Sequence, residues 1–366
     1  MPQLDGLRAI AVLLVLWFHN SPVGRHVLGY SLGEIGVGLF FVLSGFLISG
    51  ILVDSSASAA NSSEKWYLLR HFYIRRLLRL APLYWAVLLL AVILDVPTFR
   101  EFWGWHAAYA SNFYQWFHGQ GGHGSHLWSL AVEEQFYLLW PLVLVFLPRY
   151  LQRPATISML IAAPVFRILM PHLVPDHDPS RMLPNAWDYL GVGCLLAASG
   201  RAKFGRLRSS TLALGLLIAG VTIITAVQML GLSWTFRQTG LALCFGWLVW
   251  SAGEGFSGCF GRLLGSPPMV FIGNISYGIY IIQGFALFYW HWFFYSSPLP
   301  GYRICVKLGI PVSIFDGLAA EIVIRILLTF LLALISYSFL ESPIQSLKRF
   351  FPYTRKPIWN RDTSIS

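Results

Sequence analysis

The chain of 366 residues is 56% hydrophobic and only 11% charged, with a formal net charge of +10 at pH 7. Its mean hydropathy is +0.61. Because soluble domains carry about one quarter charged residues, this composition excludes an ordinary soluble enzyme and predicts an all-α, polytopic integral membrane protein. The basic excess forms no run within a readable nucleic-acid-binding fold, so we expect no nucleic-acid partner.

Apolar segments recur along the whole chain and predict where it crosses the membrane. Each crossing needs about 20 mostly apolar residues. The segments that approach this length are 5–22, 34–53, 72–95, 128–147, 155–171, 185–200, 211–230, 238–254, 269–294 and 318–340. We therefore expect about ten transmembrane helices in a single membrane domain of residues 1–345, followed by a cytoplasmic C-terminal tail of residues 346–366.

The positions of the basic residues predict the orientation. With ten spans both termini lie on one side, and most of the 26 lysines and arginines then fall in the ends and loops of that side. Cytoplasmic loops carry such an excess, so we expect both termini and the linker around Ser58 in the cytoplasm and the glycine loop around Gly121 outside. The four cysteines lie in different segments, so no disulfide is implied.

The first apolar segment places Arg8 and His19 eleven residues apart. Eleven residues are about three helical turns, so both side chains fall on one face, roughly 16 Å apart along the axis. An ionisable residue in a membrane helix is a functional candidate. His19 near the outer end has the alternative role of an interfacial histidine. A neutral imidazole can accept a hydroxyl proton near pH 7, as acyl transfer to an alcohol requires.

Three arginines, Arg75, Arg76 and Arg79, stand at the cytoplasmic start of the third span. One interpretation is anchoring by the positive-inside rule. The other is binding of a phosphorylated cofactor, since Arg76 and Arg79 are three residues apart and share a helix face.

The fourth span begins HLWSLAVEEQFY and carries a polar stripe of Ser129, Glu133 and Tyr137 at intervals of four residues. Glu134 points about 100° away. A structural ion pair is the alternative role for at least one of the two glutamates. The nearby His123 and His126 lack carboxylate or cysteine support, so we expect no metal.

Three further patterns complete the reading. In the second span, Gly45 and Ser49 are one turn apart and predict close approach of a neighbouring helix, whereas Ser44 suits either packing or a site. In the ninth span, Ser276, Tyr280 and Gln283 share a face. Glu341, two residues before Pro343, predicts a helix stop.

Six stretches of the chain together resemble the acyltransferase-3 family of membrane acyltransferases. They are LDGLRAIAVLLVLWFH, GVGLFFVLSGFLIS, FYIRRLLRLAPLYW, HLWSLAVEEQFY, NISYGIY and LESPIQSLKR, and they follow one another in order along nearly the whole chain. The resemblance implies ten core helices in a bacterial inner membrane. It also implies an enzyme that moves an acyl group, most often acetyl from acetyl-coenzyme A, to a sugar hydroxyl of an envelope polysaccharide or glycoconjugate.

Carried over by motif, His19 is the essential histidine, Arg8 its helix partner and Glu133 the acidic residue of the fourth helix. The cytoplasmic arginines Arg75, Arg76 and Arg79 are the expected donor-binding residues. Gln283 replaces a histidine that many relatives carry, and glutamine takes up no proton at physiological pH, which concentrates the proposal on His19. The expected partners are a glycan or glycolipid acceptor, acyl-coenzyme A and the bilayer.

Two mechanisms and one other function stay open at this point. We favour His19 as general base for direct attack of the acceptor on the thioester, and an acyl-histidine intermediate is the alternative. A transporter or flippase of an envelope glycolipid is the rival function, although the sequence holds no paired broken helices that would favour it. Residues 341–366 follow the last span, so we expect no appended soluble domain of the kind some relatives have.

Overall fold

The structure is a computed structural model, and it describes residues 1–27, 29–56, 61–96, 99–119, 122, 124–199, 206–231, 234–295, 300–309 and 318–354. The linker residue Ser58, the loop residues Gly121 and His123, and the tail from Arg355 onward lie outside these ranges. The predictions made for them therefore stay predictions.

Helices make up most of the described chain, and each of the ten predicted spans falls on one of them. The long helices are α1 (Pro2–Asn20), α2 (Leu32–Ser56), α3 (Ser62–Ile93), α6 (Trp128–Phe146), α7 (Arg149–Leu173), α8 (Trp187–Ser199), α9 (Arg206–Leu230), α10 (Trp234–Glu254), α12 (Pro267–Tyr295) and α14 (Leu318–Ser336). The shorter ones are α4 (Phe99–Ala107), α5 (Ser111–His118), α11 (Gly258–Leu264), α13 (Pro300–Lys307) and α15 (Ser342–Ser346), with single turns η1 (Ser125–Leu127), η2 (Pro179–Arg181), η3 (Leu183–Ala186), η5 (Tyr337–Glu341) and η6 (Leu347–Phe350). A small antiparallel hairpin of β1 (His26–Val27) and β2 (Tyr30–Ser31) follows α1.

Six helical segments among the described residues are long and apolar enough to cross a membrane. They are Leu32–Ser56, Ser62–Ile93, Ser125–Phe146, Arg149–Leu173, Ala213–Leu230 and Ala320–Phe350. By contrast, the 13 residues of α8 rise only about 20 Å, less than the roughly 30 Å of a bilayer core. The protein is thus an all-α, multi-pass membrane protein, and the number of ten spans and the orientation stay predictions.

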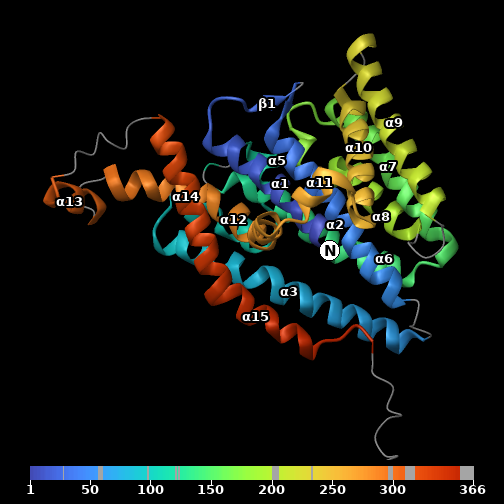
Figure 1. Ribbon diagram of the computed structural model, residues 1–366, viewed down its shortest axis with the longest axis horizontal. Coiled ribbons are helices and arrows are strands. Elements are labelled where there is room, and N and C mark those ends of the chain that lie inside the picture. The colour runs from blue at the N-terminus through green and yellow to red at the C-terminus, as the bar shows by residue number, and fades with distance from the viewer. Residues whose placement is uncertain are drawn as a thin grey trace, which may run out of the picture.

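The helices divide into a central group and two ends. Helices α7, α9 and α10 gather at one end of the molecule and α12, α13 and α14 at the other, while α3 runs along one side beside α15 (Figure 1). Helices α1, α2 and α6 lie between them (Figure 1). The largest cluster of buried apolar side chains joins residues of α2, α6, α8 and α10, so the central helices share one core.

Helices α2 and α8 pack with their backbones in contact, as Gly45 predicts. A Cβ atom on Gly45 would lie 2.2 Å from the carbonyl oxygen of Leu190, and one on Gly193 would lie 2.2 Å from that of Val42. Any side chain at either position would collide with backbone, which cannot move aside. Close approach of a neighbouring helix at Gly45 is therefore confirmed.

Two arginines inside the predicted spans, Arg167 and Arg325, form ion pairs. Arg167 of α7 forms a buried ion pair with Asp188 of α8 and donates a 2.6 Å hydrogen bond to the carbonyl of Thr235. Arg325 pairs with Glu321 one turn away on α14. Pairing removes most of the cost of burying these charges, so they fit a structural role within the bundle.

The helical path does not stop at Glu341, where the sequence predicts a stop. Instead α14 ends at Ser336, one π-helical turn follows, and α15 begins at Ser342 with Pro343 in its first turn. In the π-helical turn the backbone N–H of Ser342 bonds to the carbonyl of Tyr337, and the helical path continues past Pro343. Glu341 is buried and accepts a 3.1 Å hydrogen bond from Ser336 Oγ.

Candidate functional site

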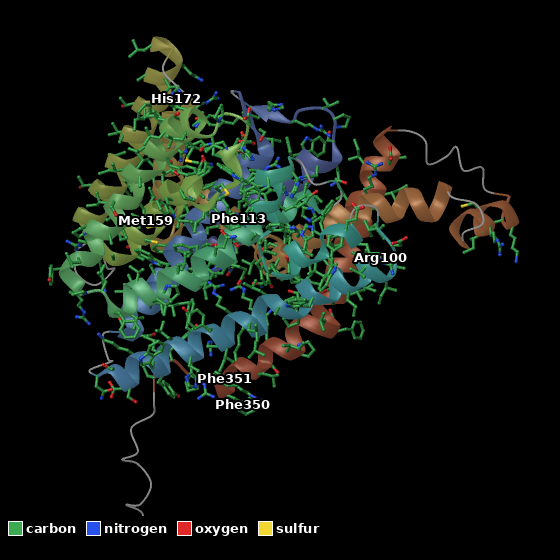
Figure 2. The ribbon with its side chains drawn as sticks, turned by 180° about the vertical axis from the view of Figure 1, so that it is seen from behind. Arg100, Phe113, Met159, His172, Phe350 and Phe351 are labelled. Carbon is green, nitrogen blue, oxygen red and sulfur yellow. The ribbon has the colours of Figure 1, made fainter. Side chains whose placement is uncertain are left out.

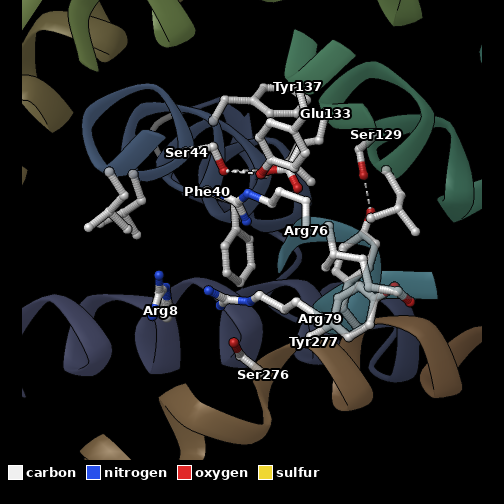
Figure 3. A pocket seen from close by; sticks show the side chains of 17 residues that line it. Arg8, Phe40, Ser44, Arg76, Arg79, Ser129, Glu133, Tyr137, Ser276 and Tyr277 are labelled. Atoms are coloured by element: carbon white, nitrogen blue, oxygen red, sulfur yellow. Dashed lines mark hydrogen bonds between the residues drawn. The ribbon is translucent and has the colours of Figure 1, made fainter. Parts of the chain in front are cut away.

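A cavity of about 90 Å³, which we call the arginine cavity, lies among five of the helices. Side chains from α1, α2, α3, α6 and α12 point into it from different sides (Figure 3). Its polar lining consists of Arg8, Ser44, Arg76, Arg79, Ser129, Glu133, Tyr137, Ser276, Tyr277 and Tyr280. The polar stripe predicted on the fourth span therefore faces one cavity, together with two of the residues predicted to share a face of the ninth.

Glu133 is held in the arginine cavity by hydrogen bonds within the bundle. Ser44 Oγ donates to Glu133 Oε1 at 2.8 Å, and the same hydroxyl lies 2.8 Å from the hydroxyl of Tyr137 (Figure 3). The guanidinium of Arg76 lies 4.4 Å from the centre of the Tyr137 ring, within range of a cation–π interaction. Ser44 thus has a role in the site as well as in packing.

The three arginines of this cavity differ in how they are paired. Arg8 forms a 2.6 Å ion pair with Asp5, one turn away on α1. Within the part of the chain that the structure describes, Arg76 and Arg79 make neither a hydrogen bond nor an ion pair. Two arginines therefore face one carboxylate, Glu133, and the cavity has a net positive charge that favours an anionic ligand.

Arg75 lies away from the arginine cavity, although the sequence groups it with Arg76 and Arg79. Its Nη1 donates to the backbone carbonyls of Lys348 and Phe351 at 2.7 and 3.2 Å, and Phe351 lies on the same side of the molecule as α3 (Figure 2). Successive residues of a helix point about 100° apart, so a neighbour of Arg76 need not share its cavity. In this structure Arg75 attaches the C-terminal segment to α3.

A second and larger cavity, of about 420 Å³, lies beyond one wall of the first. We call it the histidine cavity, because His19 and His126 line it, together with residues of several helices, of the single turns η1, η2 and η3 and of β2. The other members of its lining are Phe18, Ser31, Gly33, Glu34, Gly38, Ser125, Trp128, Ser180, Arg181, Asn185, Ala186, Tyr189 and Gln238. Val37, Phe41 and Tyr280 line both cavities and form the wall between them.

The hydrogen bond of His19 determines which of its ring nitrogens is free. Nδ1 lies 2.8 Å from the carbonyl oxygen of Val15. Because a carbonyl only accepts, we assign the hydrogen of the neutral ring to Nδ1, which leaves the lone pair of Nε2 free to accept a proton. This tautomer suits a general base.

His126 is the residue of this site that the sequence interpretation missed. The sequence groups it only with His123, as a weak metal signal, yet its ring lies 6.3 Å from that of His19, centre to centre, in an edge-to-face arrangement. Among the described residues no group of three or more metal-binding side chains occurs. Its place in the single turn η1, outside any long periodic segment, gave no helical pattern that could reveal this contact.

The structure also separates residues that the sequence placed together. Arg8 and His19 lie on the same helix but open into different cavities, joined only through the shared wall. Gln283 lines neither of these cavities; it is 1% exposed, and its amide makes no hydrogen bond to the described residues. Glu133 joins the arginines and not His19.

The fold and the two cavities describe a multi-pass helical membrane protein with one cationic and one histidine-lined cavity. Comparison with known families shows which family of membrane proteins this is. Residues 1–341 match a family model described as an acyltransferase domain, Acyl_transf_3. The chain therefore belongs to the acyltransferase-3 family, as its motifs predict. No solved structure matches it.

Several bacterial proteins are similar to the chain over almost its whole length. YrhL of Bacillus subtilis is 30% identical over 99% of this chain and 57% of its own length. The peptidoglycan O-acetyltransferase OatA of Listeria monocytogenes is 29% identical, over 98% of this chain and 60% of its own length. The O-acetyltransferase OatA of Staphylococcus aureus is 31% identical, over 94% and 57%. The chain thus spans somewhat more than half the length of these relatives.

Proposed function

We propose that the protein is a membrane O-acyltransferase that moves an acetyl group from acetyl-coenzyme A in the cytoplasm to a hydroxyl of peptidoglycan outside the bacterial inner membrane. The observation that carries the proposal is the pair of cavities separated by one wall of Val37, Phe41 and Tyr280. One cavity offers cationic groups for a phosphorylated donor, and the other offers a histidine with a free ring nitrogen.

The donor side of the proposal rests on Arg76 and Arg79. Coenzyme A is an anion that cannot cross lipid, and arginine binds phosphate oxygens with a planar fork of N–H groups. A volume of about 90 Å³ holds about three water molecules. The cavity therefore has room for the acetyl thioester end of the donor, and we place the nucleotide at its cytoplasmic mouth.

The acceptor side rests on His19. In the proposed reaction the acceptor hydroxyl oxygen forms a C–O bond to the acetyl carbon, while His19 Nε2 takes the hydroxyl proton. The C–S bond breaks, and the thiolate leaves on the side of the arginines, whose positive charge stabilises it. The thiolate then takes a proton from water, and His19 returns its proton to water, so that the cycle is closed. An acyl group on His19 itself is the alternative course.

The relatives support this substrate assignment in general terms. The Listeria relative is named as a peptidoglycan O-acetyltransferase and the Staphylococcus relative as an O-acetyltransferase, and we extend peptidoglycan as acceptor to this chain. Membership of an acyltransferase family does not favour the rival function of glycolipid transport.

The test is a transfer assay on the purified protein in lipid nanodiscs. With radiolabelled acetyl-coenzyme A and soluble peptidoglycan fragments, we expect label in the fragments only when both substrates are present. His19→Ala should lower turnover by at least roughly a hundredfold, the scale of general-base catalysis. His26→Ala is the matched control, because His26 lies in the adjacent hairpin and lines neither cavity. If His19→Ala turns over like the parent, the proposed mechanism is wrong. If the parent protein itself places no label in the fragments, the proposed function is wrong.

A further inference from the structure

One ring nitrogen of His126 is hydrogen-bonded within the fold, and the other has no hydrogen bond to the described residues. Its Nε2 lies 3.1 Å from the carbonyl oxygen of Ile281 in α12. Since the carbonyl only accepts, Nε2 carries the hydrogen of the neutral ring and Nδ1 keeps a lone pair. His126 can therefore accept a hydrogen bond at Nδ1 while its other nitrogen anchors the ring.

Several neighbouring groups hold His126 at this place. Tyr280 donates a 2.8 Å hydrogen bond from its hydroxyl to the backbone carbonyl of His126. A Cβ atom on Gly284 would lie 2.1 Å from Cε1 and 2.4 Å from Nδ1 of the ring, so the absence of a side chain there makes room for the imidazole and for a partner at Nδ1. The His126 side chain is only 5% exposed, which means that its position is determined by packing.

The histidine cavity has the character of a site for a polar ring-shaped molecule. Its volume of about 420 Å³ lies in the usual range for small-molecule pockets, roughly 300 to 1,000 Å³. Aromatic rings of Trp128 and Tyr189 and the polar side chains of Asn185 and Gln238 line the same space. A sugar presents both apolar C–H surface and several hydroxyl or amide hydrogens, and so matches this mixture.

We propose that the histidine cavity is the acceptor-sugar subsite, and that His126 binds a second hydrogen-bond donor of the sugar at Nδ1 while His19 receives the proton of the attacking hydroxyl. The acceptor must then present two donors to two histidines whose rings lie 6.3 Å apart. This inference rests on the proposed function. His126 acts as a binding and positioning residue, and His19 alone takes the proton.

Two substitutions at His126 separate its two nitrogens. His126→Gln places an amide near Nε2, which can still donate to Ile281, but it lacks an acceptor at Nδ1. His126→Asn places its side-chain oxygen near Nδ1 and lacks the anchor. We expect His126→Gln to weaken binding of a soluble peptidoglycan fragment about tenfold, the effect of one ligand hydrogen bond. His126→Asn should stay within about threefold of the parent.

The matched control is His106→Gln. His106 is also 5% exposed and lies near the same loop, where its ring stacks on Phe99 at 4.5 Å, but it lines neither cavity. Burial lowers the pKa of the His106 imidazole to about 4, so it is neutral at physiological pH, as glutamine is. We expect unchanged fragment binding in this variant.

Binding is measured directly on the full chain in nanodiscs, with the fragment alone, and turnover is measured in parallel. Parent-like binding by His126→Gln would overturn the proposal, as would equal losses in His126→Gln, His126→Asn and His106→Gln. If His126→Gln fails to insert, the binding of His126→Asn decides, and a tenfold loss there overturns the proposal. A loss of the acidic limb of the pH–rate profile in His126→Gln, where activity falls as the general base takes up a proton, would also overturn it, because His126 would then be the base. The two measurements also distinguish this proposal from the proposed function. If the proposed function is wrong, the parent protein binds the fragment but does not acetylate it.

Discussion

The arginine cavity and the histidine cavity share a wall but are built in different ways. The first is small and enclosed by long helices, and its polar groups follow helical spacing, as Ser129, Glu133 and Tyr137 do. The second is more than four times larger and, besides residues of long helices, takes part of its lining from the single turns η1, η2 and η3, including Ser125 and Ser180, and from Ser31 of β2. These turns belong to the connections between helices, and connections vary more easily than helices, so in the proposed enzyme a common donor meets the rigid side and a variable acceptor the adaptable side.

The comparison of the two cavities can be tested by substitutions in each of them, and the largest effect is expected on the donor side. Replacing Arg76 and Arg79 together by lysine keeps their positive charge but removes the planar fork. We expect the apparent Michaelis constant for acetyl-coenzyme A to rise at least about tenfold, with that for the acceptor unchanged. Steady-state kinetics in nanodiscs measures both constants.

The control for this variant is Arg75→Lys, since Arg75 bonds to the carbonyls of Lys348 and Phe351 and not to the cavity. It should leave the donor constant unchanged. Parent-like kinetics in the double lysine variant would mean that the arginines only anchor the helix, as the positive-inside alternative holds.

An intermediate effect is expected on the acceptor side from Gly284→Ala. The new methyl group would overlap the His126 ring and force it to shift. We expect the acceptor Michaelis constant to rise several-fold and the donor constant to stay the same, the mirror image of the double lysine variant. Donor and acceptor constants that rise together would show that the two cavities do not act as separate subsites.

The smallest effect should come from Glu133→Gln, which removes the negative charge of the arginine cavity and keeps an acceptor for Ser44. Attraction for the anionic donor then increases, so we expect the donor constant to fall about threefold. The difference should shrink when salt is raised, because salt screens charges. A donor constant that rises instead would assign Glu133 a direct part in holding the donor.

Much of the fold could be predicted because apolar segments mark the long helices and small residues mark close contacts. Gly45 illustrates this, since a glycine one turn from Ser49 predicts a nearby backbone whichever helix supplies it. Helical spacing also grouped Ser129, Glu133 and Tyr137 correctly. The same spacing could have separated Arg75 from Arg76, as adjacent residues point about 100° apart.

What the sequence could not provide are contacts between segments. His126 meets His19 across more than 100 positions of chain, and the carbonyl oxygens of Val15 and Ile281, which select the free nitrogen of each ring, carry no sequence signal at all. The allocation of Arg8 and His19 to different cavities depends on the side chains of α2 and α12 that come between them, Val37, Phe41 and Tyr280.

The shared wall has a consequence for the energetics of the cell. An enzyme whose two substrates arrive from opposite sides of a membrane, as proposed here, contains two water-accessible recesses with a short distance between them. If the two recesses joined into one water-filled path, protons would flow through the protein and discharge the electrochemical gradient across the membrane. Phe41 and Val37 are apolar and Tyr280 has its hydroxyl bonded to Ser129 and to the carbonyl of His126, so in the proposed enzyme these three side chains would have to insulate one recess from the other while the uncharged acetyl group passes.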